Sequence, residues 1–307
     1  MDKYGAIDVG TNSIRLLLWE EKEGKIYRKK TLNSTRIGQK VDHTGRLSQE
    51  GIKISVDAIE EFVSMAENKG IKNIPIIATS AVRDAKNRNE FVDAVLCRTG
   101  KKVHVIEGKE EARLGYLGVI MGLDEVGNIL IIDIGGGSTE FIYGDRKNIK
   151  LLESIDIGAV RLTEKFIKNE LVTKGEEEKL IDYIDESIKD IIGNMKDKPI
   201  DWVVGIGGTA TTMASMDKKM MIYDEDEVHN TKLEIKNIEM IIGQLKKMTL
   251  EERKHMAGLQ PKRADIIYTG AVILKRILDR IGKDKILISE YDNLEGLVYE
   301  QKKSEVI

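Results

Sequence analysis

Two short stretches of the chain decide its expected fold, residues 7–13 (IDVGTNS) and residues 132–138 (IDIGGGS). Each has an apolar run, an Asp-x-Gly turn and small polar residues, and each is followed by another apolar run typical of a β-strand. In both halves a third strand pattern ends at an Ile-Gly pair, Ile37-Gly38 and Ile157-Gly158. A pattern that recurs at half the chain length indicates an internal duplication. We therefore predict two similar α/β domains that face each other across a cleft.

The remaining segments alternate between strand and helix patterns, which predicts sheets flanked by helices. Ser48 is a candidate cap for a helix that ends near Gly70, and a long helix is expected from about Arg263 to Ile281. The first domain is expected to span residues 1–123, with the final helix near residues 300–307 packing back on it. The second domain is expected to span residues 124–307.

Composition limits the classes of partner. The 307 residues are 41% hydrophobic and 33% charged, as in soluble globular proteins, and no apolar run approaches the ~20 residues of a membrane span. The N-terminus has no apolar signal-peptide region, so a cytoplasmic location without a membrane partner is expected. The net charge of −3 argues against nucleic-acid binding but allows a local basic pocket for an anionic substrate. A homodimer is expected from the general prevalence of twofold symmetry.

Cysteine and histidine offer little chemistry in this chain. The one cysteine, Cys97, falls in an amphipathic helix pattern, where a buried core thiol is the expected state. The four histidines are scattered, and none has the spacing of metal ligands. Cysteine or histidine metal sites and disulfides are therefore not expected.

The two Asp-x-Gly turns are the first candidates for a functional site. Glycine-rich turns let backbone N–H groups converge on phosphate oxygens, and an aspartate at the strand end can hold Mg²⁺ directly or through its waters. The alternative is that each turn merely closes a hairpin, and the paired occurrence favours phosphate binding. The phosphate-binding candidates in these turns are Gly10, Thr11, Asn12, Ser13, Gly135, Gly136, Gly137, Ser138 and Thr139, and the metal candidates are Asp8 and Asp133. A third turn, with Gly207, Gly208 and Thr209 at a strand–helix junction, is a weaker candidate of the same kind.

Several charged residues have both a functional and a structural interpretation. Glu110 and Glu111 open a predicted helix, where acidic residues also stabilise the helix dipole, and adjacent helical residues face different directions. Arg15 and Arg83 lie near predicted turn or strand ends, where the guanidinium fork could bind phosphate or form a surface ion pair. Pattern alone leaves these alternatives open.

Eight sequence blocks, in order and covering nearly the whole chain, resemble the signature blocks of the Ppx/GppA phosphatases. These blocks are residues 5–18, 78–87, 105–119, 130–142, 155–163, 205–211, 261–265 and 289–297. The resemblance implies two actin-like domains with the ribonuclease H-like topology of the ASKHA superfamily. It also implies hydrolysis of a terminal phosphate with Mg²⁺, or with Mn²⁺ in its place.

The resemblance assigns roles by position. Glu111 matches the glutamate that activates the attacking water, and Arg83 matches a phosphate-contacting arginine. Asp133 and Glu140 match metal-associated carboxylates, with Asp8 as a further candidate. Arg15 and Arg263 resemble arginines that hold the anionic or nucleotide substrate.

Two departures from the family pattern stand out. The chain resembles the short, two-domain type, because it lacks the C-terminal helical extension of long members. Leu294 stands where many relatives have an arginine before the Glu-Gly pair.

The expected substrate is inorganic polyphosphate, hydrolysed stepwise, and guanosine pentaphosphate is the nearest alternative. Arg161, Lys165 and Lys168 on one predicted helix could extend a basic track for a long chain, although such charges usually form a solvated face. A kinase on the same fold, or a filament or nucleotide sensor without turnover, are the remaining alternatives.

Overall fold

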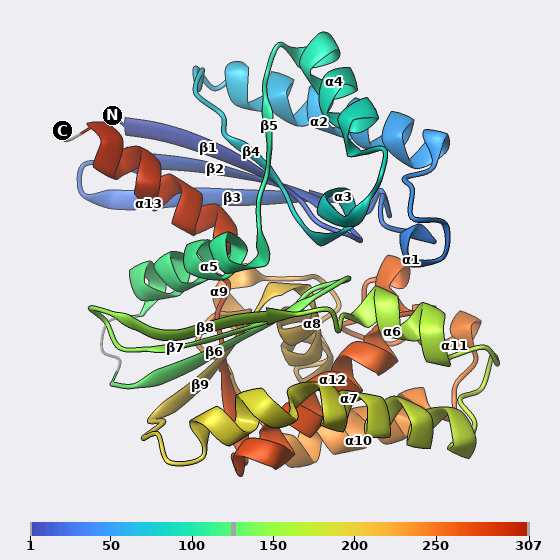
Figure 1. Ribbon diagram of the computed structural model, residues 1–307. Coiled ribbons are helices and arrows are strands. Elements are labelled where there is room, and N and C mark those ends of the chain that lie inside the picture. The colour runs from blue at the N-terminus through green and yellow to red at the C-terminus, as the bar shows by residue number, and fades with distance from the viewer. Residues whose placement is uncertain (1, 124–126, 306–307) are drawn as a thin grey trace. The chain divides into compact units, whose positions relative to one another are not determined.

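The computed structural model describes residues 2–123 and 127–305, and the chain divides into two compact units (Figure 1). Unit 1 consists of Met1–Met121 and Asp292–Ile307, and unit 2 consists of Gly122–Tyr291. The predicted boundary at residues 123 and 124 adjoins residues 124–126, which lie outside the described residues. The predicted cleft concerns how the two units sit relative to each other, and it stays a prediction.

Unit 1 is built on a five-stranded sheet in the order β3-β2-β1-β4-β5. The strands are β1 (Asp2–Val9), β2 (Ile14–Lys22), β3 (Lys25–Asn33), β4 (Ile76–Ala78) and β5 (Val103–Val105). The first three are antiparallel neighbours, whereas β1, β4 and β5 run parallel. The helices of this unit are α1 (Val41–Thr44), α2 (Gln49–Glu67), α3 (Ser80–Asp84), α4 (Arg88–Thr99), α5 (Gly108–Gly122) and α13 (Asn293–Glu305).

The alternation of side chains along β1 separates the two faces of this sheet. Ile7 and Val9 join the apolar core that includes Ile59 and Phe62 of α2. The opposite face is covered by α13, which packs on β1 and β2. In Figure 1, α2 and α4 lie on one side of the sheet and α13 lies on the other. As predicted, Ser48 caps α2, because its hydroxyl oxygen accepts the Gly51 N–H.

Unit 2 repeats this plan in a six-stranded sheet with the order β10-β11-β9-β6-β7-β8. The strands are β6 (Ile129–Ile134), β7 (Thr139–Gly144), β8 (Ile149–Ile155), β9 (Trp202–Ile206), β10 (Lys232–Glu234) and β11 (Lys285–Ile288). Strands β6, β7 and β8 are antiparallel, and β6, β9 and β11 are parallel, as in the first unit. The internal duplication predicted from the sequence is therefore present in the topology. Strand β10, which pairs antiparallel with β11, is an addition that the sequence did not indicate.

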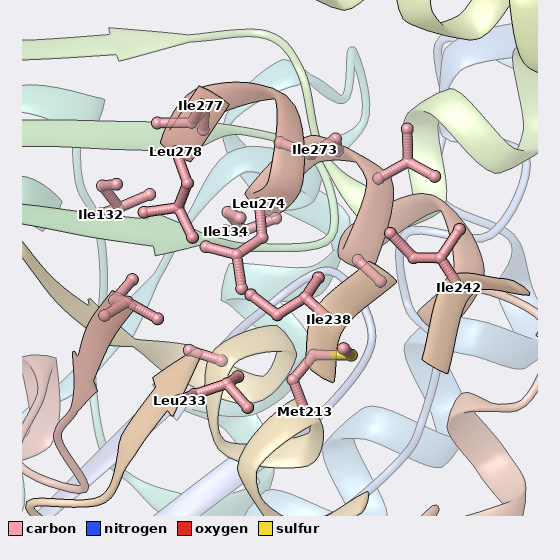
Figure 2. Packing of buried hydrophobic residues seen from close by; sticks show 14 of the residues in the cluster. Ile132, Ile134, Met213, Leu233, Ile238, Ile242, Ile273, Leu274, Ile277 and Leu278 are labelled. Carbon is pink, nitrogen blue, oxygen red and sulfur yellow. The ribbon is translucent and has the colours of Figure 1, made fainter. Parts of the chain in front are cut away.

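The helices of unit 2 bury a large apolar core against β6. They are α6 (Ala159–Phe166), α7 (Lys174–Met195), α8 (Gly207–Asp217), α9 (Glu225–Val228), α10 (Ile235–Leu245), α11 (Leu250–Lys254) and α12 (Ile267–Ile281). Figure 2 shows side chains of α12, α10 and α8 packed beside those of β6. The labelled side chains include Ile132, Ile134, Met213, Ile238, Ile242, Leu274 and Leu278. Burial of each leucine or isoleucine contributes roughly 1.5–3 kcal/mol, so this layer holds the β6 end rigidly.

Two sequence expectations differ from the structure. The helix expected from about Arg263 begins instead at Ile267, because a 3₁₀ turn over Pro261–Arg263 precedes it. Cys97 is exposed, so the expectation of a buried thiol was wrong. Helix α4 buries Phe91 and Val95, which are four residues apart, and a position two residues further on faces away from that narrow stripe. Among the described residues, no helix has the length and apolarity needed to span a membrane.

Helices α5 and α13 cross at two glycines of unit 1. A Cβ on Gly118 would overlap the backbone of Asp292, and a Cβ on Gly296 would overlap the backbone of Leu114. The neighbouring atoms are backbone atoms, which cannot move aside as the tip of a side chain can. Close approach of the two helices therefore requires glycine at both positions.

Gly118→Ala should lower the free energy of unfolding by roughly 1–3 kcal/mol, because the added methyl overpacks this crossing. Gly193→Ala in α7 is the matched control, because nothing lies within 4 Å of its added Cβ. Gly193→Ala should raise the free energy of unfolding by roughly 0.5–1 kcal/mol, because alanine has the higher helix propensity. Urea unfolding of both variants checks the prediction, and effects of the same sign would contradict it.

Candidate active site

The glycine loop between β6 and β7 has its carbonyls turned toward the start of α6. Ala159 N–H donates to Gly135 O at 2.9 Å, and the next two N–H groups donate to Gly136 O at 2.9 and 3.0 Å. The Arg161 side chain completes this set, because its Nε donates to Gly137 O at 2.7 Å. Three successive carbonyls of the loop are thus fixed from one side.

This carbonyl anchoring determines where the loop's N–H groups point. In a trans peptide the C=O of one residue lies opposite to the N–H of the next, and the described chain has no cis peptide bonds. The N–H groups of Gly136, Gly137 and Ser138 therefore point away from α6. Successive N–H groups that converge on one side of the backbone form a nest that can bind phosphate oxygens.

The loop between β1 and β2 repeats this arrangement in unit 1. Gly38 N–H donates to Thr11 O, and Arg36 N–H donates to Asn12 O, both at 3.0 Å. The N–H groups of Asn12 and Ser13 therefore turn away from the residue 36–38 segment. Both units thus turn successive loop N–H groups away from the anchoring segment at the same point of the duplicated topology.

The two loops close with the same hydrogen bond, and in each unit the glycine of an Ile-Gly pair lies against the loop. Gly10 N–H donates to Ser13 O, and Gly135 N–H donates to Ser138 O, each at 3.0 Å. A side chain on Gly158 would overlap the backbone of the glycine loop in unit 2, and one on Gly38 would overlap Thr11. The glycine of each pair therefore lets a neighbouring segment approach close enough to anchor a loop.

The paired strand residues beside the two loops differ in charge between the units. In unit 1, Asp8 pairs with Arg15 across β1 and β2, and in unit 2, Asp133 pairs with Glu140 across β6 and β7. Directly opposite residues of antiparallel strands project from the same face of the sheet. Unit 2 therefore places two carboxylates side by side, where unit 1 places an acid and a base.

The carboxylate pair of unit 2 fits a divalent cation. Asp133 and Glu140 are buried, and Ser154 donates a hydrogen bond to Glu140 Oε1 at 2.7 Å. Gly207 has a φ of +75°, and a Cβ there would overlap Asp133 Oδ1, so glycine leaves room for this carboxylate. Among residues 2–123 and 127–305, no group of three or more His, Cys, Asp or Glu side chains could hold a metal. An ion such as Mg²⁺, which commonly keeps several waters and binds phosphate oxygens, matches a site with two carboxylates.

The third glycine turn lies close to this pair. Thr209 Oγ1 donates to Ile134 O at 2.9 Å, which ties the first turn of α8 to the end of β6. A Cβ on Gly208 would overlap the guanidinium of Arg263, so this arginine lies directly against the start of α8. The predicted residues Asp133, Glu140, Gly207, Gly208, Thr209 and Arg263 are therefore gathered in one part of unit 2.

In unit 1, Arg15 belongs to a buried network of charges. Its guanidinium forms ion pairs with Asp8 and Asp292, and Lys30 lies 3.5 Å from Asp292. The network continues to Glu295, where Lys30 approaches to 3.1 Å. The acids of this group come from β1 and the start of α13, whereas its bases come from β2 and β3, so it fastens α13 to the sheet.

Burial and charge act in opposite directions within this network. Burial raises the pKa of Asp8 despite the opposing Arg15 charge. Burial also opposes ionisation of Asp292, but the nearby charges of Arg15 and Lys30 outweigh it and lower the pKa of Asp292 to about 2. Asp8 Oδ1 is buried and has no hydrogen-bond partner among the described residues.

The adjacent glutamates of α5 have different surroundings. Glu111 is buried, and its Oε2 lies 3.7 Å from Arg83 Nη1. Glu110 instead pairs with Arg113, whose hydrogen bonds lower the pKa of Glu110. Thr79 N–H donates to Val9 O at 3.2 Å, so the segment that carries Arg83 starts beside the strand leading into the first loop.

The three basic residues considered as a track for a long anionic chain all make contacts within the protein. Arg161 bonds to the glycine loop, Lys165 Nζ lies 3.7 Å from the centroid of the Tyr183 ring, and Lys168 donates to a backbone carbonyl of α6.

Leu294 is fully buried, so the position where many relatives carry arginine is an interior position in this chain.

Comparison with known proteins places nearly the whole chain in a family. A family model described as the Ppx/GppA phosphatase family matches residues 20–305. The chain belongs to the Ppx/GppA phosphatase family. A crystal structure of the Aquifex aeolicus family member is 30% identical, with a TM-score of 0.83, and covers 99% of this chain and 98% of that one. An exopolyphosphatase structure from Cytophaga hutchinsonii is 25% identical, with a TM-score of 0.92, and covers 99% and 98% of the two chains. The predicted actin-like α/β fold is thereby confirmed.

Curated relatives carry different names within this phosphatase family. The chain is 36% identical over 98% of its length to a bifunctional 3-dehydroquinate synthase/phosphatase of Fusobacterium nucleatum, and it spans 47% of that protein. It is 30% identical to exopolyphosphatase 2 of Mycobacterium tuberculosis, with 97% of this chain and 98% of that protein covered. It is 29% identical to a guanosine-5'-triphosphate,3'-diphosphate pyrophosphatase of Vibrio parahaemolyticus, of which 59% is covered.

Some features of the site could not be recognised from the sequence. The Asp292 contact with Arg15 joins residues that are 277 positions apart, and Ser154 on β8 bonds to Glu140 on the adjacent strand β7. The Ile-Gly pairs were visible as a repeat, but their anchoring role depends on hydrogen bonds to the loops.

Asp292→Asn should flatten the pH dependence of stability in acid. Because the pKa of Asp292 is lower in the folded protein than in the unfolded chain, its ionised form stabilises the fold above about pH 4. That stabilisation is lost as the pH falls toward 2 and amounts to roughly 2 kcal/mol. Thermal unfolding from pH 5 to pH 2 should show a steeper loss for the unchanged protein than for the variant. Parallel curves would contradict the assignment.

Proposed function

We propose that this phosphatase hydrolyses the terminal phosphoanhydride of an inorganic polyphosphate chain. The observation that carries the proposal is the carbonyl-anchored loop of each unit, whose N–H groups suit phosphate oxygens. A substrate with several phosphates offers such oxygens repeatedly. The relative named exopolyphosphatase 2 matches this chain end to end, which supports polyphosphate as the substrate.

Glu111 is proposed as the general base that takes a proton from the attacking water. It is buried on α5 and has Arg83 nearby, and a positioned carboxylate next to a cation is suited to hold a water against a phosphate. Arg83 would bind an oxygen of the phosphate under attack. Phosphoryl transfer depends mainly on positioning and on stabilisation of charge, which the loops and the arginines supply.

Asp133 and Glu140 are proposed to hold a divalent cation, and Asp8, whose buried Oδ1 has no hydrogen-bond partner among the described residues, is a further ligand candidate. Such a cation, Mg²⁺ or alternatively Mn²⁺, would neutralise phosphate charge and make phosphorus more open to attack. The residues of this chain would orient the phosphates through the loop N–H groups. Arg263, against the start of α8, would bind the anionic substrate. Arg15, held by two carboxylates, is a weaker candidate for that role.

Guanosine pentaphosphate is the second candidate substrate. It is favoured by the similarity to the Vibrio pyrophosphatase, which covers 97% of this chain. Hydrolysis at its 5′ end would use the same loops and the same base.

Glu111→Gln should lower the rate of phosphate release from polyphosphate by at least roughly a hundredfold, because the amide cannot accept the proton of the attacking water. Binding of the substrate should change little. Glu110→Gln is the matched control, because that neighbouring side chain pairs with Arg113 and should leave the rate within about twofold. The measurement is kcat and KM for both variants, and a Glu111→Gln enzyme of normal rate would show that another group is the base.

A further inference from the structure

We propose that Arg161 is a positioning residue, which fixes the second phosphate loop in the conformation that presents its N–H groups. The proposal rests on the phosphate-binding function proposed above for the same loop. Arg161 Nε donates to Gly137 O at 2.7 Å, in addition to the backbone N–H groups at the start of α6 that hold the two preceding carbonyls. Arg161 would thus act on the phosphates through the loop.

The two loops need different means to reach the same conformation. In unit 1 the loop carries side chains that bond to each other, with Asn12 Nδ2 donating to Ser13 Oγ at 3.2 Å and Ser13 Oγ donating to Ser34 Oγ at 3.4 Å. The corresponding residues of unit 2 include Gly136 and Gly137, which have no side chains to stiffen the turn. Glycine loses more conformational freedom on ordering than any other residue, at a cost of roughly 0.5–1 kcal/mol each relative to alanine.

The glycines of unit 2 therefore need an external support, and α6 provides it. The support is rigid, because Leu162 is fully buried in the core of unit 2. Thr163 Oγ1 also donates to Thr269 Oγ1 of α12 at 2.7 Å, which joins α6 to the helix at the centre of that core. Movement of the loop away from its anchored position would break the Arg161 bond and the backbone bonds together.

The last carbonyl of the glycine run depends on the side chain. The backbone N–H groups of α6 reach Gly135 O and Gly136 O, and it is the guanidinium that reaches Gly137 O. The orientation of that carbonyl sets the direction of the Ser138 N–H, since the two belong to one peptide plane. Loss of the Arg161 donor should therefore loosen the end of the nest nearest Ser138.

A matched pair of variants separates this bond from the charge of the arginine. Gln Nε2 and Met Cε stand the same number of bonds from Cα as Arg Nε. Arg161→Gln keeps an N–H donor at that position and removes the charge, whereas Arg161→Met removes both. Lys165→Met, one turn further along α6, removes a cation that lies over the Tyr183 ring instead of bonding to the loop.

The first measurement is binding of imidodiphosphate, a pyrophosphate analogue that resists hydrolysis, by calorimetry with Mg²⁺ present. Arg161→Met should bind at least about tenfold more weakly, a loss equivalent to one hydrogen bond, whereas Arg161→Gln should stay within about threefold of the unchanged protein. Lys165→Met should bind like the unchanged protein.

The second measurement is hydrogen exchange without ligand, over peptides that contain the amides of Gly135, Ala159 and Val160. Exchange should accelerate in Arg161→Met and not in Arg161→Gln or Lys165→Met. The proposal would be overturned if Arg161→Gln and Arg161→Met bound imidodiphosphate equally weakly while hydrogen exchange stayed unchanged. The arginine charge would then act on the ligand directly. Unchanged exchange and binding in Arg161→Met would overturn it as well. If the unchanged protein fails to bind imidodiphosphate, the proposed function fails, and the exchange result still decides whether Arg161 orders the loop.

Discussion

The orientation of a few peptide planes underlies the rest of the structure. In each unit neighbouring segments take up the loop carbonyls, which turns the following N–H groups to the other side, where we propose that they bind phosphate. That arrangement requires a segment that can approach the loop backbone closely. Gly38 and Gly158 meet this requirement, and each follows the third strand of its antiparallel group. The three antiparallel strands and the glycine that follows them therefore form one structural motif, which occurs once in each unit.

The two copies of this motif share their backbone hydrogen bonds but differ in the charges of the paired strand residues. In unit 2, Asp133 faces Glu140, and the excess negative charge suits a divalent cation. In unit 1 the corresponding pair is Asp8 and Arg15. Arg15 also forms an ion pair with Asp292 at the start of α13. The same pair of strand positions thus places two carboxylates side by side in one unit and fastens the C-terminal helix in the other. Removal of one member of such a buried network leaves the remaining charges uncompensated, so its parts depend on each other.

Local patterns predicted much of the fold. Residues 7–13 and 132–138 contain a complete strand, turn and strand start, so their meaning does not depend on distant contacts. The exposed Cys97 shows where a local pattern fails, because the buried stripe of α4 is narrower than its apolar content suggests. Resemblance to the family was needed to select Glu111 over Glu110, since both suit the first turn of a helix. The structure adds a physical difference between the two, which is the burial of Glu111 beside Arg83.

We propose that the anchored loops and Glu111 serve hydrolysis of a phosphoanhydride. The decisive measurement is phosphate release from long-chain polyphosphate and from guanosine pentaphosphate, assayed side by side with Mg²⁺ and with a chelator. Release from polyphosphate that requires the cation is expected. Release from the nucleotide alone would retain the chemistry and replace the substrate. No release from either substrate, with the cation present, would show that the loops and Glu111 do not serve this hydrolysis.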